Sequence, residues 1–393
     1  MTKNNIPKIR FKGFSNNWEK YRLGEIGTSY TGLSGKSKDD FGHGSANYIT
    51  YMNIFKNPIA NADEVEKIEI DNAQNTVKYG DVFFTTSSET PEEVGMSSVW
   101  LGNKQNLYLN SFCFGYRFND NTNIDYTFIA YLLRSKTTRK SLELLAQGIS
   151  RYNISKNKVM DIYIDSPQKT EQEKIGKFFK NIDKLITTNE QKLEKLKNIK
   201  IALLENMFPQ NNETTPKIRF KGFNDSWKEK SFADIFNYER PDKYIVKSDK
   251  YSNKYRTPVL TANKAFILGY TNETRTYNNP SIIFDDFTLE SKYVDFPYMV
   301  KSSAIKILTI KNNKNDDLYF SSKLLDTAKL EMLGHARHYI SIVQPTKVYI
   351  PQKIEQEKIG NFFKNIDNLI SLTEKKIEKL KNIKNALLEK MFV

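Results

Sequence analysis

The residues of this chain that could bind a nucleotide do not complete a phosphate-binding pattern. Gly35-Lys36-Ser37 has the sequence that closes a P-loop, but Tyr30 stands where that loop needs its first glycine. No G-x-G-x-x-G motif follows a predicted strand, so the sequence predicts no dinucleotide or S-adenosylmethionine pocket. We therefore expect no cofactor site in this chain.

Two further groups of residues could hold a metal ion. Asp286, Glu290 and Lys292 resemble the D…E-x-K pattern of nucleases, although the short gap works against a site built on two adjacent strands. His335 and His338 lie three residues apart and could bind a metal together, but a polar contact loop explains them more simply. No histidine has the spacing from serine and carboxylate that suggests a catalytic triad. We expect no catalytic and no metal-binding residue.

Two short basic loops carry the residue types that bind nucleic acid. Arginine can donate two hydrogen bonds to guanine, and lysine, tyrosine and histidine reach phosphates or base edges. The first loop reads SRYNISKNK and the second GHARHYIS. The candidate DNA-binding residues are Arg151, Tyr152, Lys156 and Lys158 in the first loop and His335, Arg337, His338 and Tyr339 in the second.

Four other residues are weaker candidates for DNA contact. Lys36 and Lys38 lie in a glycine-rich loop, and Ser87 and Ser88 follow a predicted strand. A structural salt bridge, or simple exposure to solvent, would explain any of the candidate charges without a contact to DNA.

The segment that must position these loops occurs twice. PQKTEQEKIGKFFKNIDKLITTNEQKLEKLKNIKIALLENMF begins at Pro167, and PQKIEQEKIGNFFKNIDNLISLTEKKIEKLKNIKNALLEKMF begins at Pro351. Of the 42 aligned positions, 32 are identical. Apolar residues recur at heptad spacing, which predicts two long helices with a narrow apolar seam. Each seam needs a partner, and the other copy is the obvious one.

The heptad pattern predicts which residues pair the helices. These are Ile175, Phe179, Ile182, Leu196 and Leu203 in the first helix and Ile359, Phe363, Ile366, Leu380 and Leu387 in the second. The second line of each seam is expected at Phe178, Leu185 and Ile199 and at Phe362, Leu369 and Ile383. Asn189 and Thr373 interrupt the seam; they could fix the register, or they could be tolerated polar gaps.

Charge points to a polyanionic partner. The chain has 393 residues and a formal net charge of +14, and each long helix accounts for only +2 of it. The remaining +10 lies on the other segments, which favours nucleic acid as their ligand. Cys113 is the only cysteine, which excludes an intrachain disulfide and a cysteine zinc site. No apolar run is long enough to span a membrane, so we expect no membrane contact and a cytoplasmic location.

A second repeat marks where each half of the chain begins. PKIRFKGF occurs at Pro7 and again at Pro216, and a tryptophan follows each copy at the same spacing. The halves between these repeats share little sequence. We expect a first body at 1–166, a long helix at 167–208, a linker at 209–215, a second body at 216–350 and a second long helix at 351–393.

This order of segments resembles the specificity subunit of type I restriction–modification systems. The residues that carry the resemblance are the two PKIRF…W starts and the two helix starts that contain Glu171, Gln172 and Ile175, and Glu355, Gln356 and Ile359. The resemblance covers the whole chain. It implies an α+β fold in which two mixed α/β target recognition domains are separated by two long helices. The helices would pack as an antiparallel coiled coil, and the internal repeat would be pseudo-two-fold.

The resemblance also implies a function and partners. Each recognition domain would read one half of a split sequence in double-stranded DNA, and the helices would set the nonspecific spacer between the halves. Two copies of a modification subunit would bind S-adenosylmethionine and methylate adenine N6. A restriction subunit would use ATP and Mg²⁺ to translocate and cleave DNA. This chain would direct both reactions without catalysing either.

A different class of function fits the same pattern. The chain could be a coiled-coil adaptor whose two bodies bind proteins, with its basic charge incidental. Sequence-specific binding to duplex DNA would distinguish the two hypotheses.

Overall fold

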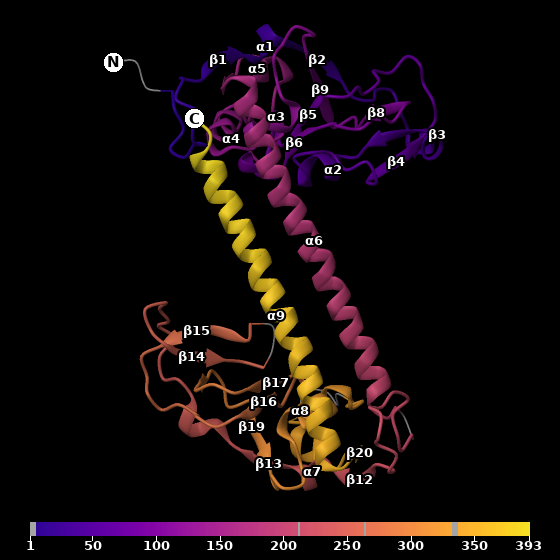
Figure 1. Ribbon diagram of the computed structural model, residues 1–393, viewed down its shortest axis with the longest axis vertical. Coiled ribbons are helices and arrows are strands. Elements are labelled where there is room, and N and C mark those ends of the chain that lie inside the picture. The colour runs from indigo at the N-terminus through magenta and orange to yellow at the C-terminus, as the bar shows by residue number, and fades with distance from the viewer. Residues whose placement is uncertain (1–4, 211–212, 263–264, 332–336) are drawn as a thin grey trace. The chain divides into compact units, whose positions relative to one another are not determined.

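The computed structural model describes residues 5–210, 213–262, 265–331 and 337–393 (Figure 1). The chain divides into two units, of which the first comprises residues 1–190 and 376–393 and the second residues 191–375. Each long helix is therefore shared, since one part of it belongs to each unit. No helix in the described ranges is long and apolar enough to cross a membrane.

The first unit contains a body of short strands and helices, followed by the start of the first long helix. Its elements are β1 (Glu19–Arg22), α1 (Leu23–Ile26), β2 (Gly27–Thr31), η1 (Lys38–Asp40), β3 (Phe41–Ile49), α2 (Tyr51–Lys56), β4 (Val65–Ile68), β5 (Val82–Thr85), β6 (Ser87–Ser88), η2 (Pro91–Glu93), β7 (Ser97–Val99), β8 (Leu107–Leu109), β9 (Cys113–Phe118), α3 (Tyr126–Leu132), α4 (Lys136–Glu143), β10 (Tyr152–Asn153), α5 (Lys156–Val159), β11 (Tyr163–Ser166) and α6 (Lys169–Met207).

The second unit has a shorter body and begins with the end of α6. Its other elements are β12 (Lys228–Ser231), α7 (Phe232–Ile235), β13 (Phe236–Glu239), η3 (Pro241–Tyr244), β14 (Thr257–Leu260), β15 (Ile267–Thr271), β16 (Ser281–Asp285), β17 (Ser291–Val294), β18 (Met299–Val300), β19 (Ile305–Ile310), α8 (Leu318–Thr327), the π-helix η4 (Tyr339–Val343), β20 (Lys347–Ile350) and α9 (Lys353–Lys390).

The two larger sheets of each body have the same topology although the sequences differ, whereas the two-stranded β10-β6 sheet of the first body has no counterpart among the described strands of the second. The strand orders β2-β9-β5-β7 and β13-β19-β16-β17 correspond one to one, as do β4-β3-β8 and β15-β14-β18. Even the pairing senses agree: β3 is antiparallel to β4 and parallel to β8, and β14 is antiparallel to β15 and parallel to β18. The mixed α/β fold is therefore repeated, and the repeat extends beyond the segments with visible sequence identity.

The repeated start of each long helix binds the neighbouring body through buried polar side chains. The carboxylate of Glu171 is fully buried and accepts two hydrogen bonds from Arg10, at 2.7 Å each. The amide oxygen of Gln172 accepts from the backbone N–H of Asp125, which caps α3, at 2.8 Å. Glutamate and glutamine at these two positions therefore attach the helix to the PKIRF segment and to the body.

The second unit repeats these contacts. Arg219 donates to the buried carboxylate of Glu355 at 2.7 and 2.8 Å, and Gln356 accepts from the N–H of Asp317, which caps α8, at 2.9 Å. The two short repeats in the sequence thus have one physical explanation, because each PKIRF copy supplies the cation that a buried helix glutamate requires.

Within each unit, the segments of α6 and α9 run antiparallel. In the first unit Asp183 pairs with Lys384 at 2.5 Å, and Glu190 pairs with Lys381 at 2.6 Å. The residue number rises along one helix as it falls along the other, which defines the direction. The second unit uses the same repeat positions, with pairs Asp367–Lys200 at 2.6 Å and Glu374–Lys197 at 2.7 Å. Coiled-coil packing along the whole length of the helices stays a prediction.

Most predicted pairing residues lie in the two hydrophobic cores. Ile175, Phe179 and Ile182 are buried in the first core, and Leu380 and Leu387 pack against it; Ile359, Phe363 and Ile366 are buried in the second core, and Leu203 packs against it. Leu196 is half-buried.

The second line of the predicted seam is wrong at four positions. Leu185, Ile199, Leu369 and Ile383 are 40–49% exposed. Two apolar residues outside the predicted seam are buried instead: Ile186, the neighbour of Leu185, and Ile377, which lies between Leu369 and Ile383 in the sequence. Both residues that interrupt the seam are buried and bond to their own helix, since the Asn189 amide donates to the Leu185 carbonyl and the Thr373 hydroxyl to the Leu369 carbonyl.

Capping side chains set the starts of the shorter helices in the bodies. Residues 125–146 contain two helices, α3 and α4, and α4 begins at a Ser135 cap. The helix α8 runs from Leu318 to Thr327. Its start is set by Asp317, whose carboxylate accepts from the N–H of Phe320 at 2.7 Å.

Candidate nucleic-acid interface

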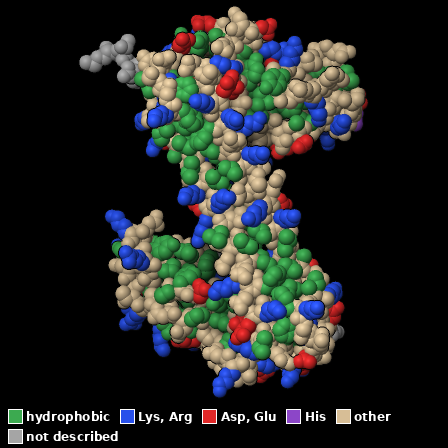
Figure 2. Space-filling view, in the orientation of Figure 1, with side chains coloured by type: hydrophobic (Ala, Val, Ile, Leu, Met, Phe, Trp, Pro, Cys, Tyr) green, Lys and Arg blue, Asp and Glu red, His purple; other side chains and the backbone are tan. Residues whose placement is uncertain are grey.

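Exposed charge by itself does not locate a binding face. On the face shown in Figure 2, lysine and arginine side chains are spread over the surface with acidic side chains between them. The pairing of each cation is therefore more informative than its position, because a cation already held by protein groups is less available to a phosphate or a base.

Five of the six arginines in the first unit are occupied by protein groups. Arg10, Arg22 and Arg117 pair with the carboxylates of Glu171, Asp161 and Asp81. Arg134 donates to the backbone carbonyls of residues 54, 55, 57 and 97, and Arg139 to those of residues 92, 94 and 95. These five guanidinium groups already have partners in the protein.

Arg151 is the sixth arginine and differs from the others. Its side chain is exposed, and it has no hydrogen bond or ion pair with any described residue of the unit. A planar guanidinium with all its donors free can bind a phosphate or make two hydrogen bonds to guanine. Among the arginines of the first unit, Arg151 therefore best fits a nucleic-acid contact.

The structure brings two sets of predicted DNA-binding residues together beside Arg151. β10 pairs with β6, so that Tyr152 lies opposite Ser88 and Asn153 opposite Ser87. Both serines are less than 10% exposed, and the Ser88 hydroxyl donates to Glu93 at 3.1 Å. In this arrangement the serines hold the loop rather than present themselves to a ligand.

The other residues of the first loop differ in exposure. Tyr152 packs partly against the first hydrophobic core. Lys156 and Lys158 lie on the single turn of α5, where Lys158 is exposed and Lys156 half-buried. Neither ammonium group has a hydrogen bond or ion pair with a described residue. Their DNA contacts stay predictions that this geometry permits.

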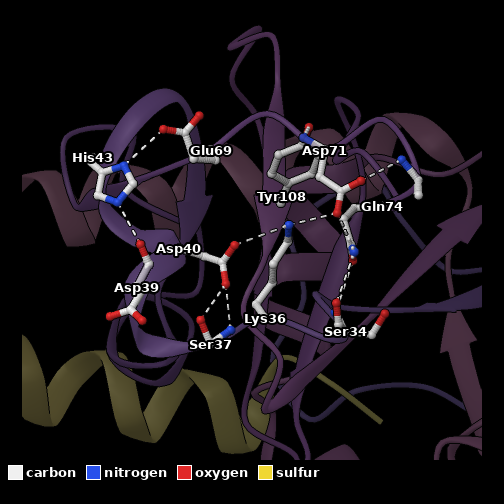
Figure 3. A network of polar contacts seen from close by, with 11 residues as sticks. Ser34, Lys36, Ser37, Asp39, Asp40, His43, Glu69, Asp71, Gln74 and Tyr108 are labelled. Carbon is white, nitrogen blue, oxygen red and sulfur yellow. Dashed lines mark hydrogen bonds and ion pairs between the residues drawn. The ribbon is translucent and has the colours of Figure 1, made fainter.

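Lys36 belongs to a polar network that ties its loop to the body (Figure 3). Its ammonium lies 2.8 Å from Asp71 and 3.8 Å from Asp40. The hydrogen bond from Lys36 lowers the pKa of the Asp71 carboxyl to about 2, and the same bond raises the pKa of Lys36. Lys36 thus fits the alternative of a structural salt bridge, whereas Lys38 is exposed and has no such bond to a described residue.

His43 closes the other side of this network. Its Nε2 lies 2.7 Å from the Asp39 carbonyl and its Nδ1 lies 3.0 Å from the Glu69 carboxylate. The bond to the Asp39 carbonyl, and after it the bond to Glu69, raise the pKa of His43. The loop around Lys36 is thereby held at both ends, and no hydrogen bond or ion pair between described residues joins it to the loop around Arg151.

The second predicted loop is anchored to the end of β16. The backbone N–H of His338 donates to the Asp286 carbonyl at 3.0 Å, and the N–H of Tyr339 donates to the Asp286 carboxylate at 2.7 Å. His338 and Tyr339 are fully buried, and burial raises the pKa of Tyr339. These buried side chains support the loop and are not exposed for contact with DNA.

Arg337 is the exposed member of this loop. Its side chain makes no hydrogen bond or ion pair with a described residue, which is the state of Arg151 in the first unit. His335 lies outside the described residues. The corresponding strands β5 and β16 thus each end beside a loop with an exposed arginine that no described residue pairs.

The nuclease and metal alternatives find no support in the described ranges. The Asp286 carboxylate forms a buried ion pair with the ammonium of Lys306 at 2.9 Å, so it has a structural role. No group of three or more histidine, cysteine, aspartate or glutamate side chains among the described residues could hold a metal ion.

The sequence analysis missed three arginines. Arg240, Arg256 and Arg275 are exposed loop residues of the second unit, and each lacks a hydrogen bond or ion pair with a described residue. They have no repeat partner and no motif around them, so only the pairing of side chains in the structure distinguishes them from Arg219.

Comparison with known proteins agrees with the repeated architecture. Residues 15–198 and 224–382 each match the family model described as type I restriction modification DNA specificity domain. The chain is 43% identical over 132 residues to the EcoR124I/EcoR124II specificity subunit of Escherichia coli, a match that covers 32% of this chain and 33% of that relative. It is 22% identical to the putative MjaX specificity subunit of Methanocaldococcus jannaschii, over 98% of this chain and 95% of the relative.

Solved structures show the same fold. The type I restriction–modification S subunit of M. genitalium aligns over 99% of both chains with a TM-score of 0.69 and 16% identity. A structure described as showing complex assembly and conformational transition of the type I R-M system aligns over 94% of this chain and 96% of that one, with a TM-score of 0.52 and 13% identity. With both halves matched by the family model, this chain belongs to the family of type I restriction–modification specificity subunits.

Proposed function

We propose that this chain reads a bipartite sequence in double-stranded DNA, with one unit contacting each half and a nonspecific spacer between the halves. The observation that carries the proposal is the repeated topology of the two bodies. Corresponding strands β5 and β16 end beside loops of different sequence, and each loop presents one unpaired arginine, Arg151 or Arg337. A fixed scaffold with two different contact loops suits the reading of two different sequences.

The chemistry would belong to partner subunits. Two copies of a modification subunit would bind S-adenosylmethionine and methylate adenine N6, and a restriction subunit would use ATP and Mg²⁺ to cleave DNA. The described residues include a duplicated apolar face that supports two copies of one partner. Leu185 and Ile199 on α6, and Leu369 and Ile383 on α9, occupy equivalent repeat positions and are all exposed. The complex would act on DNA in the cytoplasm.

The alternative is an adaptor that binds only proteins. The same exposed helix residues favour it, because a duplicated apolar face also suits two copies of a protein unconnected with DNA. The free arginines in equivalent loops favour the DNA-reading function instead.

Replacing either free arginine should change recognition of one half of the target only. We expect Arg151→Ala and Arg337→Ala each to cost about 1–3 kcal/mol of binding, or roughly 5- to 150-fold, because a bidentate contact to a base is removed. The measurement is competition binding of the chain, with its modification subunit, to duplexes in which each base pair of the target is varied in turn.

Lys104→Ala is the matched control for this experiment. Lys104 is exposed, lies outside both loops and has no hydrogen bond or ion pair with a described residue. We expect its loss to weaken all duplexes slightly and equally. If Arg151→Ala and Arg337→Ala behaved like this control, neither arginine would read bases. If the unsubstituted chain failed to prefer its target over a scrambled duplex, the adaptor would be the better account.

A further inference from the structure

The loop that carries Arg151 is closed at its base by the backbone. Gln147 and Asn153 exchange two hydrogen bonds, with N–O distances of 2.9 and 2.8 Å. Gly148 has φ +142°, and a Cβ there would lie 2.0 Å from the Arg151 carbonyl oxygen, so no other residue fits without moving the chain. The residues between 148 and 152 therefore project from the unit on a fixed base.

The tip of this loop exposes a large apolar side chain. Ile149 is 95% exposed, the highest value for a large hydrophobic residue in the described ranges. A single exposed apolar residue on a surface is ordinary. Ile149 differs because two backbone hydrogen bonds fix the base of its loop, and because Arg151, which has no hydrogen bond or ion pair with a described residue, is two residues away.

A second exposed apolar residue, an aromatic one, lies beside the same anchor point. Thr86, at the end of β5, donates to the Phe112 carbonyl from its backbone N–H at 3.0 Å and from its hydroxyl at 2.7 Å. The Thr86 carbonyl in turn accepts from the N–H of Ile154 at 2.9 Å. Phe112 is 59% exposed. The segment with Phe112 and the loop with Ile149 and Arg151 thus both hydrogen-bond to Thr86, directly after β5.

We propose that Ile149 is a wedge that inserts between neighbouring base pairs of the first half of the target, while Arg151 makes its contact to a base of the DNA beside that step. This inference rests on the proposed DNA-reading function. Apolar side chains that enter a base step unstack it and bend the duplex, and nearby cations hold the backbone in place. Free cations next to the isoleucine favour DNA over a protein as the occupant, because Arg151 and Lys158 would otherwise meet apolar protein surface without partners.

A wedge in this position would assist chemistry on a base. An enzyme that modifies a base inside a duplex must extrude it, and extrusion is easier where stacking is already weakened. Ile149 would supply that weakening from the recognition chain, while the partner subunit would supply the pocket that receives the base.

The test uses the full chain with its modification subunit and target duplexes in which 2-aminopurine occupies one position of the first half at a time. S-adenosylmethionine is left out so that no turnover occurs. We expect the unsubstituted complex to raise the fluorescence at one step, and Ile149→Ala to abolish that rise. The affinity should fall by about tenfold at most, because the variant forgoes the packing of isoleucine against the bases but no longer has to unstack them. Ile149→Met, which keeps a long apolar side chain, should retain the rise.

Leu144→Ala is the matched control, since Leu144 is 78% exposed but lies outside the pinned loop. It should leave the fluorescence unchanged. A rise that survives in Ile149→Ala would overturn the wedge. The wedge would also be overturned if Ile149→Ala left DNA binding intact but weakened association with the modification subunit, because the side chain would then contact protein. Failure of the unsubstituted complex to prefer the target would overturn the wedge and the DNA-reading function together.

Discussion

Arg10→Ala should destabilise the first unit by about 3–5 kcal/mol, because it leaves the buried carboxylate of Glu171 without its cation. Glu171 is fully buried, and Arg10 is 9% exposed and supplies both hydrogen bonds. The same segment also binds the end of α9, where the N–H of Ile9 donates to the Lys390 carbonyl at 2.9 Å. Its release should therefore loosen both helix segments of that unit.

The second unit provides a matched experiment for this prediction. Arg219 binds the buried Glu355 in the same geometry, and the N–H of Ile218 donates to the Asn206 carbonyl at the end of α6. Hydrogen exchange, followed peptide by peptide, should show reduced protection in the first unit for Arg10→Ala and in the second unit for Arg219→Ala.

Two controls limit the interpretation of that result. Arg22→Ala, which removes an exposed ion pair with Asp161, should change exchange little. Arg10→Ala combined with Glu171→Gln should recover part of the protection, since the buried charge is then gone. A uniform decrease of protection in both units after either single substitution would contradict the assignment of one PKIRF segment to each unit.

Replacing the first body with a copy of the second should produce a protein that reads the second half-sequence twice. In this chimera, a copy of residues Trp227–Ile350 replaces residues Trp18–Ser166. The shared topology of the larger sheets makes the exchange feasible, and the helix contacts are retained because Gln172 and Gln356 bind the capping aspartate of each body in the same way. We expect the affinity for the original first half to fall by about 10³-fold or more, to the level of nonspecific binding.

The measurement is competition between duplexes that carry the original target and duplexes that carry two copies of the second half. The reverse graft, with two copies of the first body, is the control and should prefer two copies of the first half. A chimera that still preferred the original target would show that the bodies do not read sequence independently.

The chimera must also keep a tyrosine that donates to the long helix, because the hydroxyls of Tyr131 and Tyr319 donate to equivalent helix aspartates, Asp183 and Asp367.

The sequence predicted the long helices well because repetition and heptad spacing are local signals. The first helix, expected at 167–208, is observed as α6 from Lys169 to Met207. The heptad pattern did not predict which apolar residues beside the main seam are buried. Leu185 and Ile199 match a heptad as well as Ile186 does, and only packing shows that Ile186 is buried and the other two are exposed.

The resemblance to a known family predicted two mixed α/β bodies, but their shared strand order could not be worked out from the residues, because pairing between distant strands leaves little trace in either sequence. β14 and β18 are paired although about 40 residues separate them in the chain. β3 and β8 are paired across a still longer stretch of sequence. Loop residue types were a weak guide for a related reason. Arg151 and Arg139 look alike in sequence, and only the carbonyls around Arg139 show that it is structural.

Residues next to each other in the second loop also behave differently for a physical reason. Arg337 is exposed, whereas the next two side chains enter the core, where Tyr339 packs on Phe284 with ring centroids 5.5 Å apart. The change is imposed by Asp286, which binds both backbone N–H groups of His338 and Tyr339. A residue 53 positions before Tyr339 thus decides which side chains of the loop are available.

The most direct test of the account maps methylated adenines in DNA from a methylation-free host that expresses this chain with its modification subunit. The account predicts that every methylated site shares two defined blocks of bases separated by an undefined gap of constant length, and that Arg151→Ala relaxes one block and Arg337→Ala the other. A single uninterrupted block, or the same methylated sites in cells without this chain, would contradict it.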